Sequence, residues 1–269
     1  MTDRKKTILY VVCSYGFFWV AIGLIGVVIM LMGDGAEVFQ EGNIFPFLPA
    51  IAAWTPTLAL FVLFKKLYPN ISIKEFYKNA FHQRLNIGLL LCVTITQLGV
   101  FFGGVGLIAG FQGLSFESLL GISLPTLVSG FLWSLLGGGA TGEQSGWRGF
   151  LQPHMEKKYS VIKASVIVGL IWGFWHAPLW FMWGYSGLDL VWVILGYMVS
   201  ITMAAIIIGI CYNRCKNLFV PIWIHFMFNF VLTMYTGELL AIIATMAILY
   251  TVVTVGYIVW HKHSSISGP

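Results

Sequence analysis

The residues of this sequence best suited to chemistry fall in three short polar stretches that interrupt apolar segments. Carboxylate, imidazole, guanidinium and amide side chains can transfer protons, bind a metal ion or donate hydrogen bonds to a reacting group. In order along the chain, the stretches contain Glu143, Gln144 and Arg148; Trp172 and His176; and His225 and Asn229. We therefore examine them as candidates for a catalytic site.

The three stretches can meet at one depth within a bilayer. Depth can be counted along each helix from its nearest lysine, with about 1.5 Å of rise per residue. His176 and Asn229 each lie roughly 20 Å from that lysine, Glu143 lies at most about 21 Å from it, and His225 roughly 14 Å. His225 and Asn229 are four residues apart, so they share one helix face. An ionisable group at such depth is costly unless it is partnered, which makes it a functional candidate.

A purely structural interpretation competes with the functional one. A single His or Asn within a membrane helix often only joins neighbouring helices through hydrogen bonds. Arg148 follows Gln144 by four residues and is compatible with anchoring its helix. A Glu, an Arg, two His and an Asn at matched depth nevertheless favour a functional site over five separate helix contacts.

The elements that must position these residues are membrane-spanning helices. Apolar residues make up 58% of the 269 positions and charged residues 9%, whereas a soluble domain carries roughly a quarter of its residues as charges. A span needs about 20 mainly apolar residues. We therefore expect an all-α polytopic membrane bundle of about eight spans, near residues 7–32, 46–64, 85–111, 123–147, 162–183, 189–210, 217–235 and 239–260.

The charged residues indicate the orientation of this bundle. In an eight-span arrangement all 15 Lys and Arg residues fall on one side. The opposite loops contain only acidic charges, at Asp34, Glu37, Glu41, Glu117, Asp189 and Glu238. The positive-inside bias then places the N- and C-termini in the cytoplasm. The net charge of +5 is thus a feature of topology and does not indicate a nucleic-acid partner.

We expect one integral membrane domain over residues 1–269, with the motifs in a core of about 123–235. Pairs of glycines four residues apart, Gly99 with Gly103 and Gly106 with Gly110, would allow close approach of the third span to a neighbour, as in ordinary helix packing. The four cysteines form no C-x-x-C pair and are interpreted as packing residues.

Other catalytic patterns fit less well. The segment Gly184-Tyr185-Ser186-Gly187 matches the G-x-S-G of rhomboid serine proteases. The expected topology, however, places Ser186 in an external loop, whereas the depth of His225 is counted from the cytoplasmic side. No H-E-x-x-H zinc motif occurs, and no spans carry paired aspartates. Glu143, His176 and His225 could still form a two-His, one-carboxylate metal site, so zinc stays an open alternative.

The three stretches together resemble the CPBP family of intramembrane proteases (CAAX protease and bacteriocin-processing, or Abi). Glu143 and Arg148 match its E-[EQ]-x-x-x-R motif, Trp172 and His176 its aromatic-x-x-x-H motif, and His225 with Asn229 its H-x-x-x-N motif; these pairs lie within residues 130–235. The sequence departs from the usual pattern at Gln144, where the family commonly has a second glutamate. Trp172 replaces the more usual phenylalanine.

The resemblance implies a glutamate-dependent intramembrane endopeptidase with no cofactor. Glu143 and His176 would activate a water molecule, and His225 and Asn229 would stabilise the oxyanion. Gln144, Arg148 and Trp172 would support them. The implied partners are the lipid bilayer and a peptide or protein substrate, lipidated or not. A metalloprotease that uses the same residues, and a non-catalytic immunity factor, scaffold or small-solute transporter, are the alternatives.

Overall fold

Apolar stretches form helices throughout the part of the chain that the structure describes. The computed structural model describes residues 1–31 and 48–266, so Asp34, Glu37 and Glu41 lie outside it. The α-helices are α1 (Asp3–Leu31), α3 (Leu48–Ala52), α4 (Thr55–Val62), α5 (Phe64–Leu67), α6 (Ile73–Phe81), α7 (Ile87–Gln112), α8 (Leu124–Leu132), α9 (Ala140–Gly146), α10 (Gln152–Glu156), α11 (Val161–Trp175), α12 (Ala177–Trp180), α13 (Gly187–Cys215), α14 (Phe219–Leu232) and α15 (Leu239–Ile266). The expected all-α bundle is confirmed.

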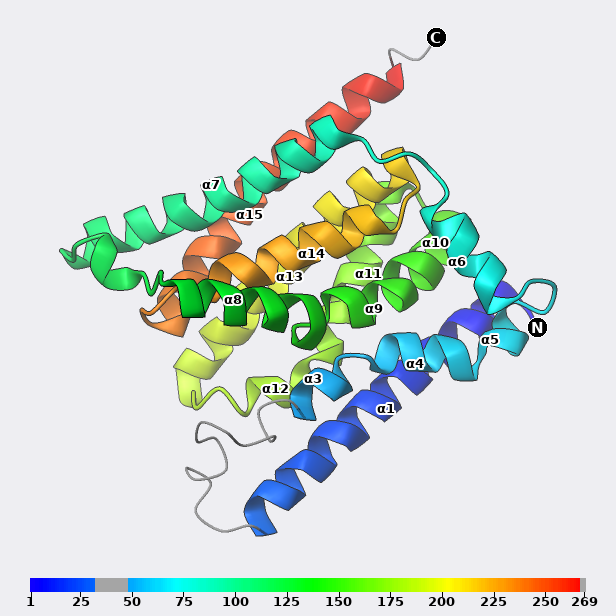
Figure 1. Cartoon of the computed structure of the whole chain (residues 1–269), viewed down its shortest axis with the longest axis horizontal. Coiled ribbons are helices and arrows are strands. Elements are labelled where there is room, and N and C mark those ends of the chain that lie inside the picture. Colours follow the sequence, from blue (N-terminus) through cyan, green and yellow to red (C-terminus); the bar gives the residue numbers. More distant parts are fainter. Residues whose placement is uncertain (32–47, 267–269) are drawn as a thin grey trace.

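Four described helices are long and apolar enough to cross a membrane: α1, α7, α13 and α15. Two shorter apolar helices, α11 and α14, coincide with the expected fifth and seventh spans. α13 packs against both α11 and α15, and α7 against α14 and α15 (Figure 1). The chain is an integral membrane protein whose motif-bearing helices lie among these longer ones.

Two expected spans are broken into shorter helices. The described part of the 46–64 segment forms α3 and α4, and Pro56 stands in the first turn of α4, where a proline is tolerated. The 123–147 segment forms α8, a π-helical turn at Trp133–Gly137 and α9. It then continues beyond its expected end through a second π-helical turn at Trp147–Leu151 into α10. The first motif therefore lies in the middle of a long interrupted helix.

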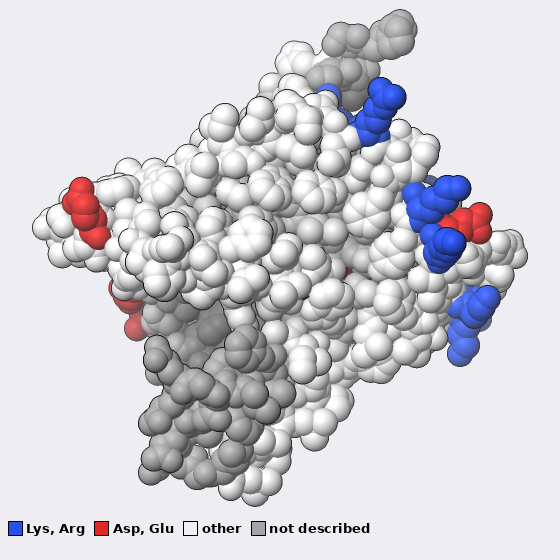
Figure 2. Space-filling model, viewed as in Figure 1, with Lys and Arg blue, Asp and Glu red and all other residues white. Residues whose placement is uncertain are grey.

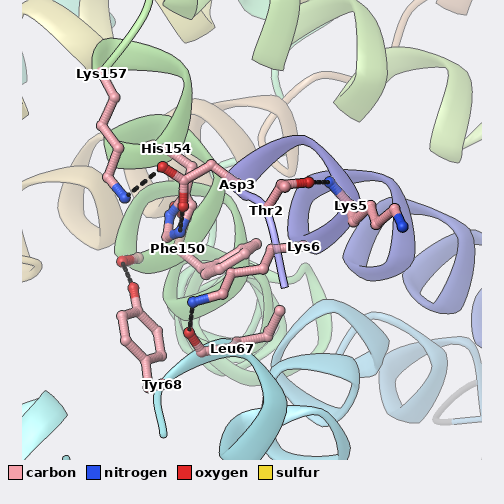
Figure 3. Close-up of polar contacts among 10 residues, drawn as sticks. Thr2, Asp3, Lys5, Lys6, Leu67, Tyr68, Phe150, His154 and Lys157 are labelled. Carbon is pink, nitrogen blue, oxygen red and sulfur yellow. Dashed lines mark hydrogen bonds and ion pairs between the residues drawn. The ribbon is translucent and has the colours of Figure 1, made fainter. Parts of the chain in front are cut away.

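A contact cluster at one end of the bundle ties this interrupted helix to α1 and α5 (Figure 3). Lys157 Nζ, just after α10, pairs with Asp3 Oδ2 at 3.1 Å. Lys6 Nζ donates to Leu67 O at 2.7 Å, and Tyr68 Oη donates to Gly149 O at 3.5 Å. The cluster fixes the segment that follows Glu143.

Charged side chains separate between two edges of the molecule. In Figure 2 the visible Lys and Arg side chains lie along one edge, and acidic side chains lie at the far edge, with one acidic group also among the basic ones. Between the edges the visible surface is almost free of charge, as expected for a surface in contact with lipid.

The two glycine pairs of the third span take no part in its packing. A Cβ atom added at Gly99, Gly103 or Gly110 would have no neighbour within 4 Å, and one at Gly106 would only reach Phe116 at 4.0 Å. The tighter approach lies between α11 and α13. There a Cβ atom on Gly169 would lie 2.9 Å from the Thr202 Cα atom. Spacing alone did not reveal which glycine face meets a partner helix.

We expect Gly169→Leu to destabilise the protein, because the leucine would force α11 away from α13. Overpacking of this kind typically costs about 1–3 kcal/mol or more. Thermal unfolding in detergent measures the effect, with Gly110→Leu as the control because the space around Gly110 is open. Equal midpoints for the two variants would contradict the assigned packing.

Candidate functional site

Glu143 owes its position to a glycine turn. Gly139 precedes α9 with φ +82°, a left-handed conformation that favours glycine. The Glu143 side chain folds back over this turn, so that a Cβ atom on Gly139 would lie 1.8 Å from Glu143 Oε1. Glu143 is 2% exposed. Its carboxylate is thus held in place by backbone that only glycine can provide.

Two indole groups hold the Glu143 carboxylate. Glu143 Oε2 accepts a hydrogen bond from Trp147 Nε1 at 3.3 Å. It accepts another from Trp172 Nε1 on α11. Trp147 lies one turn after Glu143, whereas Trp172 belongs to the second motif. The first two motifs are therefore joined directly.

Trp172 also contacts the third motif, so it links all three. Its ring centroid lies 4.9 Å from that of His225, with the two planes at 80°. The Arg148 guanidinium carbon lies 4.4 Å from the Trp172 ring centroid on its face. The Trp172 carbonyl oxygen accepts a hydrogen bond from His176 Nδ1 at 2.8 Å. Trp172 is thus the centre of the contacts among the predicted site residues.

The hydrogen bonds of the two histidines assign opposite tautomers to their neutral forms. His176 Nδ1 faces a carbonyl oxygen, which can only accept, so Nδ1 carries the proton and Nε2 can accept one. His225 Nδ1 lies 2.8 Å from the Gln144 amide nitrogen, which can only donate. His225 therefore carries its proton on Nε2. One imidazole is prepared to accept a proton and the other to donate a hydrogen bond.

His176 stands where α11 ends. Pro178 lies in the first turn of α12 and has no N–H with which to continue the α11 hydrogen-bond pattern. The chain bends at His176, whose φ and ψ are −76° and 0°. This bend leaves the imidazole at the end of a helix, partly exposed, next to the ring of Tyr197 on α13, 5.5 Å away between centroids.

Asn229 contacts the glycine turn from the opposite side. Its Nδ2 atom donates to Gly138 O at 2.5 Å. A Cβ atom on Gly138 would lie 2.9 Å from that nitrogen. Since an amide nitrogen has two hydrogens, the second remains for another acceptor. The turn at Gly138 and Gly139 therefore contacts both the carboxylate of Glu143 and the amide of Asn229.

Four of the predicted residues line a cavity of about 370 Å³: Trp172, His176, His225 and Asn229. The rest of its wall is mainly apolar and comes largely from α13, α14 and α15, including Ile201, Phe228, Leu232, Ile242 and Met246. Glu143 stands behind this wall and is connected to it by the hydrogen bond to Trp172. The cavity can hold an apolar group next to the polar side chains of His176, His225 and Asn229.

Arg148 is fully buried, with 0% exposure. Among the described residues its three guanidinium nitrogens have no hydrogen-bond partner, and its contact is the face of Trp172. Gln144 pairs with His225 and not with Arg148. Arg148 therefore places its guanidinium group beside Trp172 without hydrogen bonds to the described residues, and whether it anchors its helix stays a prediction.

The described side chains do not form the ligand set that the metal alternative requires. Within the described residues, no three His, Cys, Asp or Glu side chains are placed to hold one ion. Glu143 Oε2 faces two indole N–H groups, and His225 Nδ1 faces an amide donor.

The serine alternative concerns Ser186, which precedes α13 in the loop after α12. Ser186 is not among the described residues that line the His225 cavity.

The sequence motifs missed Gly138, Gly139 and Trp147 as parts of the site. The run Gly137-Gly138-Gly139 was visible, but nothing in a glycine run shows which side chain will pack over it. Trp147 lies four residues after Glu143, so helical spacing alone could have placed its indole near the carboxylate.

Comparison with known proteins agrees with these motifs. Residues 124–231 match the family described as type II CAAX prenyl endopeptidase Rce1-like. The chain is also similar to CAAX prenyl protease 2 of Methanococcus maripaludis, with 30% identity over 203 residues that cover 72% of each protein. The matched residues include all three motifs.

Proposed function

The chain belongs to the Rce1-like family of type II CAAX prenyl endopeptidases, and from that premise we propose how it cleaves a peptide bond within the membrane. Glu143 and His176 activate a water molecule, and His225 and Asn229 stabilise the oxyanion. The observation that carries the proposal is the set of contacts around Trp172, which joins the three motifs beside one cavity.

The first step is attack of water on the scissile carbonyl carbon. Among the described residues His176 Nε2 has no hydrogen-bond partner, so it can accept a hydrogen bond from water. The Glu143 carboxylate provides a second basic group, since both of its indole contacts are made through Oε2 and leave Oε1 for the water. As the new C–O bond forms, the water proton passes to this pair, and the carbonyl oxygen becomes an oxyanion. The pair then gives the proton to the leaving nitrogen as the C–N bond breaks.

The second requirement is a set of donors aimed at the oxyanion. His225 donates through Nε2–H because Gln144 occupies Nδ1. Asn229 donates through the hydrogen of Nδ2 that does not bind Gly138 O. Such donors act strongly in a site that excludes bulk water, and removal of one typically lowers the rate by about 10²–10³-fold.

The substrate that fits best is a protein or peptide with a prenylated C-terminal segment. The named relative is a CAAX prenyl protease, and the cavity beside the polar atoms is mainly apolar. An isoprenoid chain can be accommodated among such side chains without loss of hydrogen bonds.

The proposal also includes the topology of the protein, a single membrane domain with both termini in the cytoplasm. The positive-inside bias of the charged residues supports this orientation.

Cleavage of a farnesylated peptide by the purified protein in detergent tests this function. We expect cleavage by wild type, a preference over the same peptide without the prenyl group, and indifference to a chelator. His176→Ala should lower cleavage by about 10²–10⁴-fold. Loss of wild-type activity with chelator and its return with zinc would support the metalloprotease alternative. A wild type that cleaves neither peptide would favour a non-catalytic membrane protein.

Gln144 should control the tautomer of His225. Gln144→Leu leaves the buried Nδ1 atom without its donor, and such a loss costs about 1–3 kcal/mol, or roughly 10–100-fold in rate. In Gln144→Glu the new carboxyl group can donate to Nδ1 only while it is protonated, and its ionised form can only accept. We therefore expect that variant to lose activity relative to wild type as pH rises and the new carboxyl group ionises. A fully active Gln144→Leu protein would contradict the role.

A further inference from the structure

A second cavity lies at the basic edge of the molecule and takes no part in the proposed reaction. Its volume is about 1120 Å³. It is bounded by the segment that enters α7, by the last turn of α13 and by the final turns of α15. α7 and α15 run side by side here, near the end of α15 (Figure 1). The cavity is therefore an interhelical space near the cytoplasmic ends expected for α7, α13 and α15.

Two arginines give this cavity a positive charge. Arg84 comes from the α6–α7 loop and Arg214 from the end of α13, and both line it. The ion pairs found in the described part of the chain join Asp3 to His154 and Lys157, and Glu156 to Lys216, so neither arginine has a carboxylate partner there. Two unneutralised guanidinium groups around one space form a site for an anion.

The Arg214 side chain and the loop that carries Arg84 are held in place before any ligand binds. The Arg214 guanidinium carbon lies 3.6 Å from the ring centroid of Trp260, so the ring supports the flat group. The loop that carries Arg84 is fixed by Asn217, whose Nδ2 atom donates to Phe81 O at 3.2 Å and to Gln83 O at 2.5 Å. This preorganisation reduces the conformational entropy that ligand binding would cost.

The start of α7 adds further donors. Asn86 Oδ1 accepts from Leu89 N at 3.0 Å and caps the helix. Gly88, in the first turn, lines the same cavity. The first N–H groups of a helix have no partner within it and carry a partial positive charge, which suits a phosphate group.

One part of the wall is apolar. Leu89, Val253 and Tyr257 line the cavity beyond the arginines, toward the middle of the spans. A free phosphate compound would gain nothing from that wall, whereas an acyl chain would. We propose that this cavity binds an anionic phospholipid, with its phosphate between Arg84 and Arg214 and an acyl chain between α7 and α15. The site is separate from the proposed catalytic function.

Removal of the two arginine charges tests the phosphate contact. Binding of phosphatidylglycerol and of phosphatidylcholine to the detergent-purified full chain is measured by native mass spectrometry. We expect wild type to prefer phosphatidylglycerol and Arg84→Gln/Arg214→Gln to bind it at least about tenfold more weakly. The matched control is Lys65→Gln/Lys66→Gln, which removes two exposed basic charges from α5, outside the cavity. An equal loss in both double variants would show general charge attraction and overturn the site.

Filling the apolar wall tests the acyl contact. A Cβ atom on Gly256, which lines the cavity, would meet nothing within 4 Å, so Gly256→Leu should fill the space without disturbing its neighbours. We expect Gly256→Leu, which keeps both arginines, to bind phosphatidylglycerol more weakly than wild type. Gly110→Leu, whose added side chain also enters open space, should bind it as wild type does. Unchanged lipid binding in Gly256→Leu, or binding of glycerol phosphate as tight as that of the lipid, would overturn the assignment to a phospholipid.

Discussion

Glu143→Gln is expected to lower peptide cleavage by at least about 10³-fold while the protein remains folded. Glutamine has nearly the shape of glutamate, and its amide oxygen can still accept the indole N–H groups of Trp147 and Trp172. What it loses is the ability to take a proton from water. The measurement is the rate of farnesylated-peptide hydrolysis together with the thermal unfolding midpoint of the same preparation.

Glu117→Gln is the matched control for this prediction, because it makes the same chemical change at an exposed residue, the first of the 3-10 turn Glu117–Leu119. It should cleave like wild type. A Glu143→Gln protein that keeps more than about a tenth of the wild-type rate would argue that Glu143 is not the base. His176 would then be the first residue to reassign to that role.

Gly139→Ala is expected to impair catalysis more than stability. The alanine would have to adopt φ +82° and would place its Cβ atom 1.8 Å from Glu143 Oε1. The left-handed backbone costs about 1–2 kcal/mol. The steric conflict must move the carboxylate, and a displacement of about 1 Å can cost 10²-fold in rate. Unfolding midpoints and hydrolysis rates separate the two effects.

Gly113→Ala provides a control with the same backbone penalty and no steric conflict. Gly113 also has a positive φ, at 66°, and a Cβ atom there would have no neighbour within 4 Å. Both alanine variants should lose similar stability, but only Gly139→Ala should lose activity. If the two lose activity equally, strain and not the position of Glu143 explains the effect.

Much of the site follows from residue types and spacing. Glu143, His176, His225 and Asn229 were predicted to lie at similar depth because helical rise is constant, and the structure places the three motifs around Trp172. Membrane class and helical architecture follow from the scarcity of charge, because an unpaired charge or backbone group is too costly in lipid. These properties depend on composition and on periodicity along one helix, which the sequence contains directly.

Contacts between helices were decided only by the tertiary structure. The glycine spacing in α7 would allow close packing, yet the tighter approach lies at Gly169, because rotation of a helix about its axis depends on all of its neighbours. The role of Gly139 depends on the Glu143 side chain, which folds back over the Gly139 backbone. The pairing of Gln144 with His225 depends on how α9 meets α14. The sequence by itself thus determined which groups lie within the membrane, and the packing of the helices decided which atoms face one another.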